Sequence, residues 1–169
     1  MNKKKDLFCI KDKNILLIGF KGILGTGYKN YLIGKCKTLI LADIQSSDLS
    51  EISQSSKIKT QIIYKKVDVS DETSVKELFD NIEKYKPIHG VISNAAITGE
   101  FLRDQGNKNA FPSFEEYPLS LFKKTLDVNL VGCFLIAKYC SQMFKNQGYG
   151  SLINVASIYG VVAPDHEIY

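Results

Sequence analysis

The chain has 169 residues, of which 44% are hydrophobic and 24% are charged, a composition typical of a globular domain large enough to bury a core. Its net charge of +4 comes from dispersed lysines and a single arginine, Arg103, so we expect no basic face of the kind that binds nucleic acid. No apolar run is long enough to cross a bilayer and the basic start lacks the apolar stretch of a signal peptide, so we expect a cytoplasmic protein that binds no membrane.

Short apolar runs alternate with helical patterns along the chain. We predict strands at 14–19, 37–42, 60–67, 88–93 and 151–156, because these runs are rich in isoleucine, valine and leucine with little alternation. Helices are predicted near 25–35, 48–56, 71–85 and 118–146. Strands that alternate with helices form parallel sheets with right-handed crossovers. The sequence therefore predicts an α/β fold with a doubly wound parallel sheet of the Rossmann type, in a single domain over residues 1–169.

Two of the predicted helices have clear patterns. Ser70 is a plausible N-cap for the helix at 71–85, whose apolar stripe is Val75, Leu78, Phe79 and Ile82. The helix at 118–146 opens at Pro118, and its predicted stripe is Phe122, Leu126, Leu130, Cys133, Ala137, Cys140 and Phe144. Residues 97–117 are polar and contain glycine, and a connection this long inside a compact domain is usually functional or mobile.

A turn with spaced glycines follows the first strand. Gly19, Gly22 and Gly25 stand where a dinucleotide-binding turn requires residues without side chains. Such a turn lets a pyrophosphate approach the backbone, and the helix that begins near Gly25 then points its amides at the phosphates. The spacing differs from Gly-x-Gly-x-x-Gly, and glycines after a strand also simply close turns. A phosphate-binding P-loop is excluded because Tyr28 stands where its lysine belongs.

Asp43 ends the second predicted strand, about 20 residues after the glycines, where a ribose-binding acid is expected. A carboxylate at that place accepts hydrogen bonds from both ribose hydroxyls and repels a 2′-phosphate. No arginine or lysine follows in residues 44–47. The sequence therefore favours NAD as the cofactor, with NADP less favoured.

The four cysteines indicate no metal site. Cys9, Cys36, Cys133 and Cys140 form no Cys-x-x-Cys pair, and both histidines are distant in sequence. Cys133 and Cys140 lie two helical turns, about 10 Å, apart, which is too far for a disulfide. We interpret the cysteines as small core residues in a reducing compartment.

Four further motifs, in order along the chain, resemble those of the short-chain dehydrogenase/reductase family. They are Val67-Asp68-Val69-Ser70-Asp71, Ser93-Asn94-Ala95-Ala96, Asp127-Val128-Asn129-Leu130-Val131-Gly132 and Gly150-Ser151-Leu152-Ile153-Asn154-Val155-Ala156-Ser157. The resemblance covers nearly the whole chain. It implies that Asp68 contacts the adenine ring and that Asn94 and Ala95 also bind the cofactor. It further implies two catalytic residues: Ser157 bonds the substrate oxygen, and Asn129 supports a water on the proton path.

The family's proton-transfer tyrosine and its lysine, four residues later, are the last landmarks. Tyr169 lies twelve residues after Ser157, within the family's range, and the sequence given stops there. The segments Ser157-Ile158-Tyr159-Gly160 and Ala163-Pro164 also resemble those of a subgroup that modifies bacterial surface sugars and flagellin. In that subgroup the proton-transfer tyrosine comes later in the chain. Two alternatives therefore stay open: the proton-transfer tyrosine is Tyr169, or it is a tyrosine beyond the sequence given. We expect the fold to be incomplete at its C-terminus and this fragment to be inactive.

These patterns together predict an NAD(P)-dependent oxidoreductase that transfers hydride to or from a carbonyl or secondary alcohol, in a substrate with sugar-like character. The partner is a small-molecule substrate, and the resemblance implies a homo-oligomer for the full-length form. Arg103, in residues 97–117, is a candidate clamp for an anionic group on the substrate. The alternative is a noncatalytic dinucleotide-binding or regulatory module, which would keep Gly19, Gly25 and Asp43.

Overall fold

A computed structural model of the chain describes residues 8–45, 59–97 and 114–162. Five parallel strands form one sheet in the order β3-β2-β1-β4-β5. The strands are β1 (Asn14–Ile18), β2 (Thr38–Asp43), β3 (Gln61–Lys66), β4 (Gly90–Ser93) and β5 (Ser151–Asn154). All five predicted strands are present, and each is one to two residues shorter at one or both ends than predicted, except that β2 is shifted by one residue. The predicted Rossmann-type fold class is confirmed.

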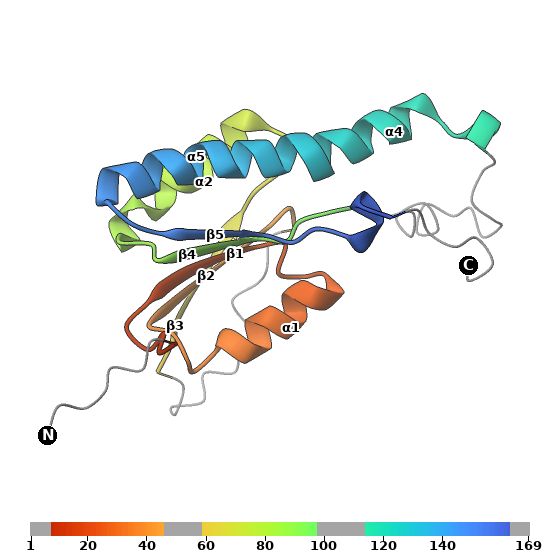
Figure 1. Cartoon of the computed structure of the whole chain (residues 1–169). Helices are drawn as coiled ribbons and strands as arrows, with labels where there is room; N and C mark the ends of the chain where they lie inside the picture. The colour runs from red at the N-terminus through yellow and green to blue at the C-terminus, as the bar shows by residue number, and fades with distance from the viewer. Residues whose placement is uncertain (1–7, 46–58, 98–113, 163–169) are drawn as a thin grey trace, which may run out of the picture.

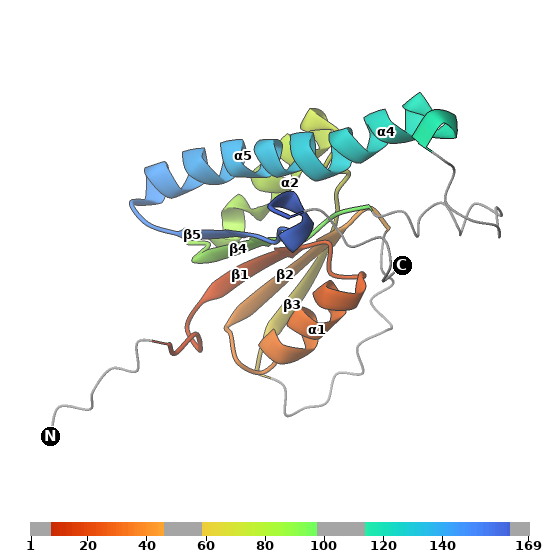
Figure 2. The same cartoon turned by 45° about the vertical axis from the view of Figure 1, so that its right-hand side comes forward.

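Helices cover both faces of the sheet (Figure 1). Helix α1 (Ile23–Leu32) lies against one face, and α2 (Glu72–Ile82), α4 (Leu119–Leu126) and α5 (Gly132–Gln147) lie on the other, an arrangement that Figure 2 shows from a second side. Because successive strand residues point to opposite faces, Ile15 and Leu17 pack under α1 while Leu16 and Ile18 pack under α2 and α5. This two-sided burial explains why the strands show almost no polar alternation.

The carboxyl ends of four strands meet at one edge of the sheet. Ile18 of β1 is in register with Ala42 of β2 and with Ser93 of β4, and Ser93 is in register with Asn154 of β5. In an open parallel sheet, this edge is where ligands bind. The loops that follow these strands carry the glycine turn and the other predicted site residues.

Helix α2 begins one residue later than predicted. Its N-cap is Asp71, whose carboxylate accepts a hydrogen bond from the N–H of Thr73 at 2.9 Å. Ser70 is not the cap, because its N–H and its hydroxyl both donate to Asp68. The predicted stripe is confirmed, since Val75, Leu78, Phe79 and Ile82 are all buried. The last predicted turn, Glu83–Tyr85, is a 3-10 turn.

The predicted helix at 118–146 is continuous but not uniform. Between α4 and α5, residues Asp127–Val131 form a turn of π-helix. The wider turn shifts the helical face by about one residue, so the predicted stripe is wrong in its first half: Phe122, Leu126 and Leu130 are exposed. In α5 the residues that enter the core are Leu135, Ile136, Cys140 and Met143. Gly148, with φ of +82°, ends the helix in the left-handed conformation.

Several sequence predictions fall outside the described residues. These are the helix at 48–56, most of the connection at 97–117 with Arg103, and Tyr169. Within the described part of the chain, β5 pairs only with β4 and so forms one edge of the sheet. In the same part, no helix is both long enough and apolar enough to cross a membrane.

Candidate functional site

The turn after β1 is built so tightly that two of its glycines are obligatory. Gly19 has φ of +80°, and a Cβ there would lie 2.5 Å from the backbone nitrogen of Ala95. A Cβ on Gly25 would lie 2.7 Å from the Cα of Phe20 and closer still to the carbonyl oxygen of Gly19. A Cβ on Gly22 would meet no protein atom closer than 3.9 Å. Gly19 and Gly25 therefore serve the fold, whereas a side chain at Gly22 would project where a ligand approaches.

Helix α1 begins at Ile23, with Gly22 as its N-cap, two residues earlier than predicted. No side chain caps this end of the helix. The first amides of a helix have no partner within it and carry the positive end of its dipole. The turn thus leaves backbone donors next to the glycines, which is the arrangement that holds phosphate groups in other proteins.

The carboxylate of Asp43 is fixed against this turn. One of its oxygens, Oδ2, accepts a hydrogen bond from the backbone N–H of Lys21 at 3.0 Å. This hydrogen bond connects the end of β2 to the turn that follows the neighbouring strand β1. The sequence predicted Asp43 at the site but gave no signal of the Lys21 backbone contact.

The loop after β3 orients Asp68 in a similar way. Its Oδ1 accepts from the N–H of Ser70 at 2.9 Å and from the Ser70 hydroxyl at 2.6 Å, while its own N–H donates to the Ser74 hydroxyl. The second oxygen, Oδ2, has no hydrogen bond from these residues and is left to accept one from a ligand. This local turn is the reason that Ser70 is unavailable as the helix cap.

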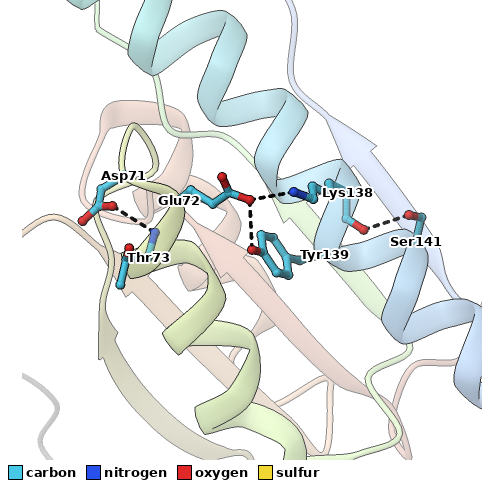
Figure 3. A network of polar contacts seen from close by, with 6 residues as sticks. All are labelled: Asp71, Glu72, Thr73, Lys138, Tyr139 and Ser141. Atoms are coloured by element: carbon cyan, nitrogen blue, oxygen red, sulfur yellow. Dashed lines mark hydrogen bonds and ion pairs between the residues drawn. The ribbon is translucent and has the colours of Figure 1, made fainter.

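Helix α5 supports this loop from behind. Gly132 lies so close to it that a Cβ would come within 2.8 Å of the Val69 side chain. At the first residue of α2, the Glu72 carboxylate accepts from the Lys138 ammonium at 2.6 Å and from the Tyr139 hydroxyl at 3.2 Å, both on α5 (Figure 3). The hydrogen bond from Lys138 is the main cause of the lowered pKa of Glu72. The Tyr139 ring also stacks on Phe79 of α2, so α2 and α5 are held together beside the loop.

Asn94 joins the loop after β4 to the glycine turn. Its side-chain amide donates to the carbonyl oxygen of Gly19 at 2.9 Å, and its backbone N–H donates to Ile18. Ala95 follows directly and forms the wall against which Gly19 packs. The two residues predicted from the motif after β4 are therefore structural partners of the turn as well as candidates for cofactor contact.

These loops enclose a cavity of about 470 Å³ at the carboxyl edge of the sheet. Six of the seven residues predicted to bind the cofactor line it, and Gly25 lies behind the turn: the six are Gly19, Gly22, Asp43, Asp68, Asn94 and Ala95. Lining residues that the sequence analysis missed include Lys21, Gln45, Ile97 and Lys124. Lys124 lies in the predicted helix at 118–146, for which the sequence pattern indicated only the apolar stripe, so its place at the cavity was not predicted.

Asn129 lies in the π-helical turn, and its side chain holds the backbone of Ile97. The amide donates to the Ile97 carbonyl and accepts from the Ile97 N–H, each at 2.9 Å. One donor and one acceptor of the side chain are thus used to fix the end of the loop after β4. The predicted support of a water by Asn129 stays a prediction.

Ser157 follows β5 beyond the carboxyl edge of the sheet. Its hydroxyl oxygen accepts from the N–H of Tyr159 at 3.2 Å, capping the 3-10 turn Ile158–Gly160. The hydroxyl hydrogen is not used in that contact and can be donated to a ligand. The side chain is exposed. Tyr169 lies outside the described residues. Among the described residues, no group of three or more histidine, cysteine or acidic side chains is arranged to hold a metal ion.

Three features define a Rossmann-type fold: a parallel sheet in the order 3-2-1-4-5, a glycine turn before a helix, and an acid at the end of the second strand. The sequence profile described as short chain dehydrogenase matches residues 13–169. The chain belongs to the short-chain dehydrogenase/reductase family.

Individual relatives agree with this assignment. The chain is 29% identical over 133 residues to the post-translational flagellin modification protein A of Campylobacter coli, covering 77% of this chain and 49% of that protein. A crystal structure of a short-chain dehydrogenase from Leptospira borgpetersenii with bound NAD+ superposes with a TM-score of 0.77 at 26% identity, over 100% of this chain and 61% of that one.

A second solved structure is that of an enzyme described as dependent on the other nicotinamide cofactor. The NADPH-dependent 3-quinuclidinone reductase of Rhodotorula rubra matches with a TM-score of 0.76 at 25% identity, over 97% of this chain and 60% of that one. The chain spans between 32% and 49% of the length of these curated relatives. Solved relatives thus include both NAD- and NADP-type proteins, and the choice between them depends on the residues of this chain.

Proposed function

We propose that the chain forms the cofactor-binding part of an NAD-dependent oxidoreductase that acts on a carbonyl or secondary alcohol. The observation that carries this proposal is the convergence of Gly19, Gly22, Asp43, Asp68 and Asn94 on one cavity at the carboxyl edge of the sheet. When bound, the nicotinamide group supplies or accepts the hydride.

The residues of the cavity fit a dinucleotide. A Cβ at Gly22 would meet no protein atom closer than the Gly19 carbonyl oxygen at 3.9 Å, and the uncapped end of α1 begins beside it, so a pyrophosphate can reach the backbone there. The Asp43 carboxylate is held in place by Lys21 and can accept from ribose hydroxyls. Asp68 keeps one oxygen for an amino group, since Ser70 occupies the other.

Asp43 favours NAD over NADP on electrostatic grounds. A 2′-phosphate placed on the ribose would face a fixed carboxylate, and like charges at close range in a partly enclosed site repel each other strongly. Lys21 lines the same cavity, and its positive charge acts in the opposite direction. The preference for NAD therefore requires that the Asp43 carboxylate, which the Lys21 N–H holds against the turn, lie nearer to the ribose than the positive charge of Lys21 does.

Ser157 and Asn129 are the proposed catalytic residues. The Ser157 hydroxyl can donate to a substrate oxygen, because its own oxygen already accepts from Tyr159 and its hydrogen does not participate in that bond. Asn129 acts through position, holding Ile97 at the rim of the cavity and supporting a water. The sugar-like substrate is proposed from the motif resemblance to the subgroup that modifies bacterial surface sugars and flagellin, and a flagellin modification protein is among the relatives. Arg103 is the proposed partner for an anionic group on that substrate.

The test is a fluorescence titration of the chain with NADH and with NADPH. We expect tighter binding of NADH, and Asp43→Asn should narrow the difference by improving the affinity for NADPH. The asparagine keeps an oxygen for the Lys21 N–H but removes the charge. Asp80→Asn, an exposed carboxylate on α2, is the matched control and should leave both affinities unchanged. Equal or tighter binding of NADPH by the unmodified chain would overturn the preference for NAD.

A further inference from the structure

Basic residues gather at the edge of the sheet that lies opposite the cavity. The first residues of three strands are in register there, with Asn14 beside Thr38 and Thr38 beside Gln61. Because the strands are parallel, the lysines that precede them meet at this edge although they are distant in sequence. Among the described residues, the lysines within three positions before β1, β2 and β3 are Lys11, Lys13, Lys35, Lys37 and Lys59, which we call the basic edge. Asp12 is the carboxylate in the same described positions.

Lys13 and Lys37 are direct neighbours within the basic edge. They precede the register pair of Asn14 and Thr38, and the N–H of Lys37 donates to the carbonyl oxygen of Lys13 at 2.9 Å. Like charges at neighbouring positions on adjacent strands destabilise a fold. Among the described residues, neither of these lysines takes part in an ion pair. A local feature that opposes stability in this way is typical of a functional surface.

Hydrogen bonds fix the loops that carry this edge. Thr60 is buried, and its hydroxyl donates to the carbonyl oxygen of Cys36 at 2.6 Å and accepts from the N–H of Gly34 at 2.8 Å. The residue that follows Lys59 is thereby bound to the loop between α1 and β2. The basic edge is therefore preorganised, which lowers the entropic cost of binding a partner across it.

The positive field of the basic edge reaches the next strand. His89 directly precedes β4, and its Nδ1 accepts from the N–H of Asn14 at 3.1 Å. Burial is the main cause that lowers the pKa of His89, and the charges of Lys13 and Lys37 lower it further. The field of the two lysines therefore acts across the amino ends of β1, β2 and β4.

The shape and composition of the basic edge favour an acidic polypeptide over other polyanions. The lysines follow one edge of a sheet, so they form a row that suits a linear ligand. The ring of Tyr31 beside this row is covered by the Lys35 ammonium, 3.5 Å from the ring centroid, which disfavours stacking of a nucleic-acid base. The described residues contain no arginine, the side chain that holds phosphate through two parallel hydrogen bonds.

We propose that the basic edge docks an extended segment of a partner protein that is rich in aspartate and glutamate, with Lys13 and Lys37 at the centre of the contact. The surface lies at the opposite edge of the sheet from the cofactor cavity, so this proposal does not depend on the proposed function.

The experiment compares the double variant Lys13→Gln/Lys37→Gln with the matched control Lys76→Gln/Lys123→Gln. The control removes the same charge from exposed lysines of α2 and α4. Binding of a fluorescent oligoglutamate peptide at physiological salt is measured by anisotropy, with oligoglutamine as the neutral probe. Loss of two exposed ion pairs corresponds to about a tenfold rise in Kd, which we expect for the first variant and not for the control.

Two further measurements separate binding from a structural role. Bound carboxylates oppose the field of the two lysines, so the pKa of His89, followed by NMR, should rise when the peptide is added. The variant His89→Gln assigns the signal. Removing the like-charge pair should also raise the urea midpoint of Lys13→Gln/Lys37→Gln, whereas loss of a structural contact would lower it.

Each outcome bears on the proposal. A weaker complex in the first variant, an unchanged control and a raised pKa of His89 support it. Equal losses in the two double variants show binding by overall charge and overturn it. Tighter binding of an oligothymidylate of the same net charge, or of phosphatidylserine vesicles, assigns another class of partner and overturns it. An unmodified chain that does not bind oligoglutamate at physiological salt overturns it as well.

Discussion

The side-chain amide of Asn129 pairs with the backbone of Ile97 as a neighbouring strand would, donating to its carbonyl oxygen and accepting from its N–H at 2.9 Å each. The pair connects the π-helical turn between α4 and α5 to the loop that follows β4. Because Ile97 lines the cavity, the pair fixes one wall of the candidate cofactor site. An amide side chain is required, since both a donor and an acceptor are used.

Asn129→Asp should destabilise the fold because a carboxylate cannot donate a hydrogen bond to the Ile97 carbonyl. The second carboxylate oxygen would instead lie against that carbonyl oxygen, and the two partial negative charges repel. We expect the free energy of unfolding to fall by about 1–2 kcal/mol. Urea denaturation followed by circular dichroism measures this change. Asn146→Asp is the control: the exposed Asn146 only accepts, from Gln142, so its aspartate keeps the bond and should change stability by less than about 0.5 kcal/mol. Equal effects in the two variants would contradict the structural role of the pair.

Alanine substitutions at the glycines of α1 and of the turn before it should have different effects on stability and on NADH binding. Gly25→Ala forces a methyl group into the backbone of Gly19 and Phe20, and we expect a loss of about 3 kcal/mol in the free energy of unfolding. Gly27→Ala, in the same helix, meets no atom within 4 Å and should stabilise by about 0.5–1 kcal/mol. Gly22→Ala should leave stability nearly unchanged and weaken NADH binding. Thermal unfolding and NADH titration of the three variants check these outcomes.

Stability should fall as the pH is lowered through the range where His89 titrates. Burial is the main cause that lowers the pKa of His89, and the charges of Lys13 and Lys37 act in the same direction. The neutral ring accepts at Nδ1 from the N–H of Asn14 at 3.1 Å, a bond that a protonated Nδ1 cannot make. The ring also contacts Tyr149 at a centroid distance of 5.6 Å.

The sign of this effect follows from the direction of the shift. A lowered pKa in the folded state means that the contribution is fully present above the unfolded pKa of about 6.5 and is lost as the pH falls through the folded value. We expect the free energy of unfolding, measured in urea from about pH 8 to about pH 5, to decline more steeply in the unmodified chain than in His89→Gln. Identical slopes for the two proteins would show that His89 does not contribute.

Much of this architecture could be predicted from local sequence. Runs such as Ile15–Ile18 and Leu39–Ala42 are apolar because both faces of their strands are covered, and Gly19 and Asp43 follow those strands at the spacing that the cavity requires. These features depend on residues close together in the chain. Composition and spacing therefore indicated the fold class and three of the lining residues, Gly19, Gly22 and Asp43. The family resemblance supplied the other three, which are Asp68, Asn94 and Ala95.

Other features depend on contacts that span the chain, and no local pattern reveals them. The π-helical turn at Asp127–Val131 shifts the buried face of the long helix, so Phe122 and Leu130 are exposed although an ideal helix would place them in line with Cys140. The turn coincides with the Asn129 pair to Ile97, 32 residues away in sequence. The N-cap at Asp71 has a local cause instead, because Ser70 is bound to the carboxylate of Asp68, two residues before it.

The outer face of α4 and the start of α5 forms an exposed apolar stripe made of Leu119, Phe122, Leu126, Leu130 and Phe134, each between 40% and 64% exposed. An apolar patch of this kind on a helical face is a typical protein–protein contact. We propose that a second copy of the chain covers it, in line with the expected homo-oligomer.

Phe122→Glu and Phe134→Glu should each shift the chain toward the monomer, because a buried carboxylate without a partner is costly. The control is Tyr31→Glu on α1, whose ring is also exposed but lies on the opposite face of the sheet. Light scattering after size-exclusion chromatography at micromolar concentration measures the association. A monomeric unmodified chain, or equal association in all three variants, would show that the stripe is not the contact.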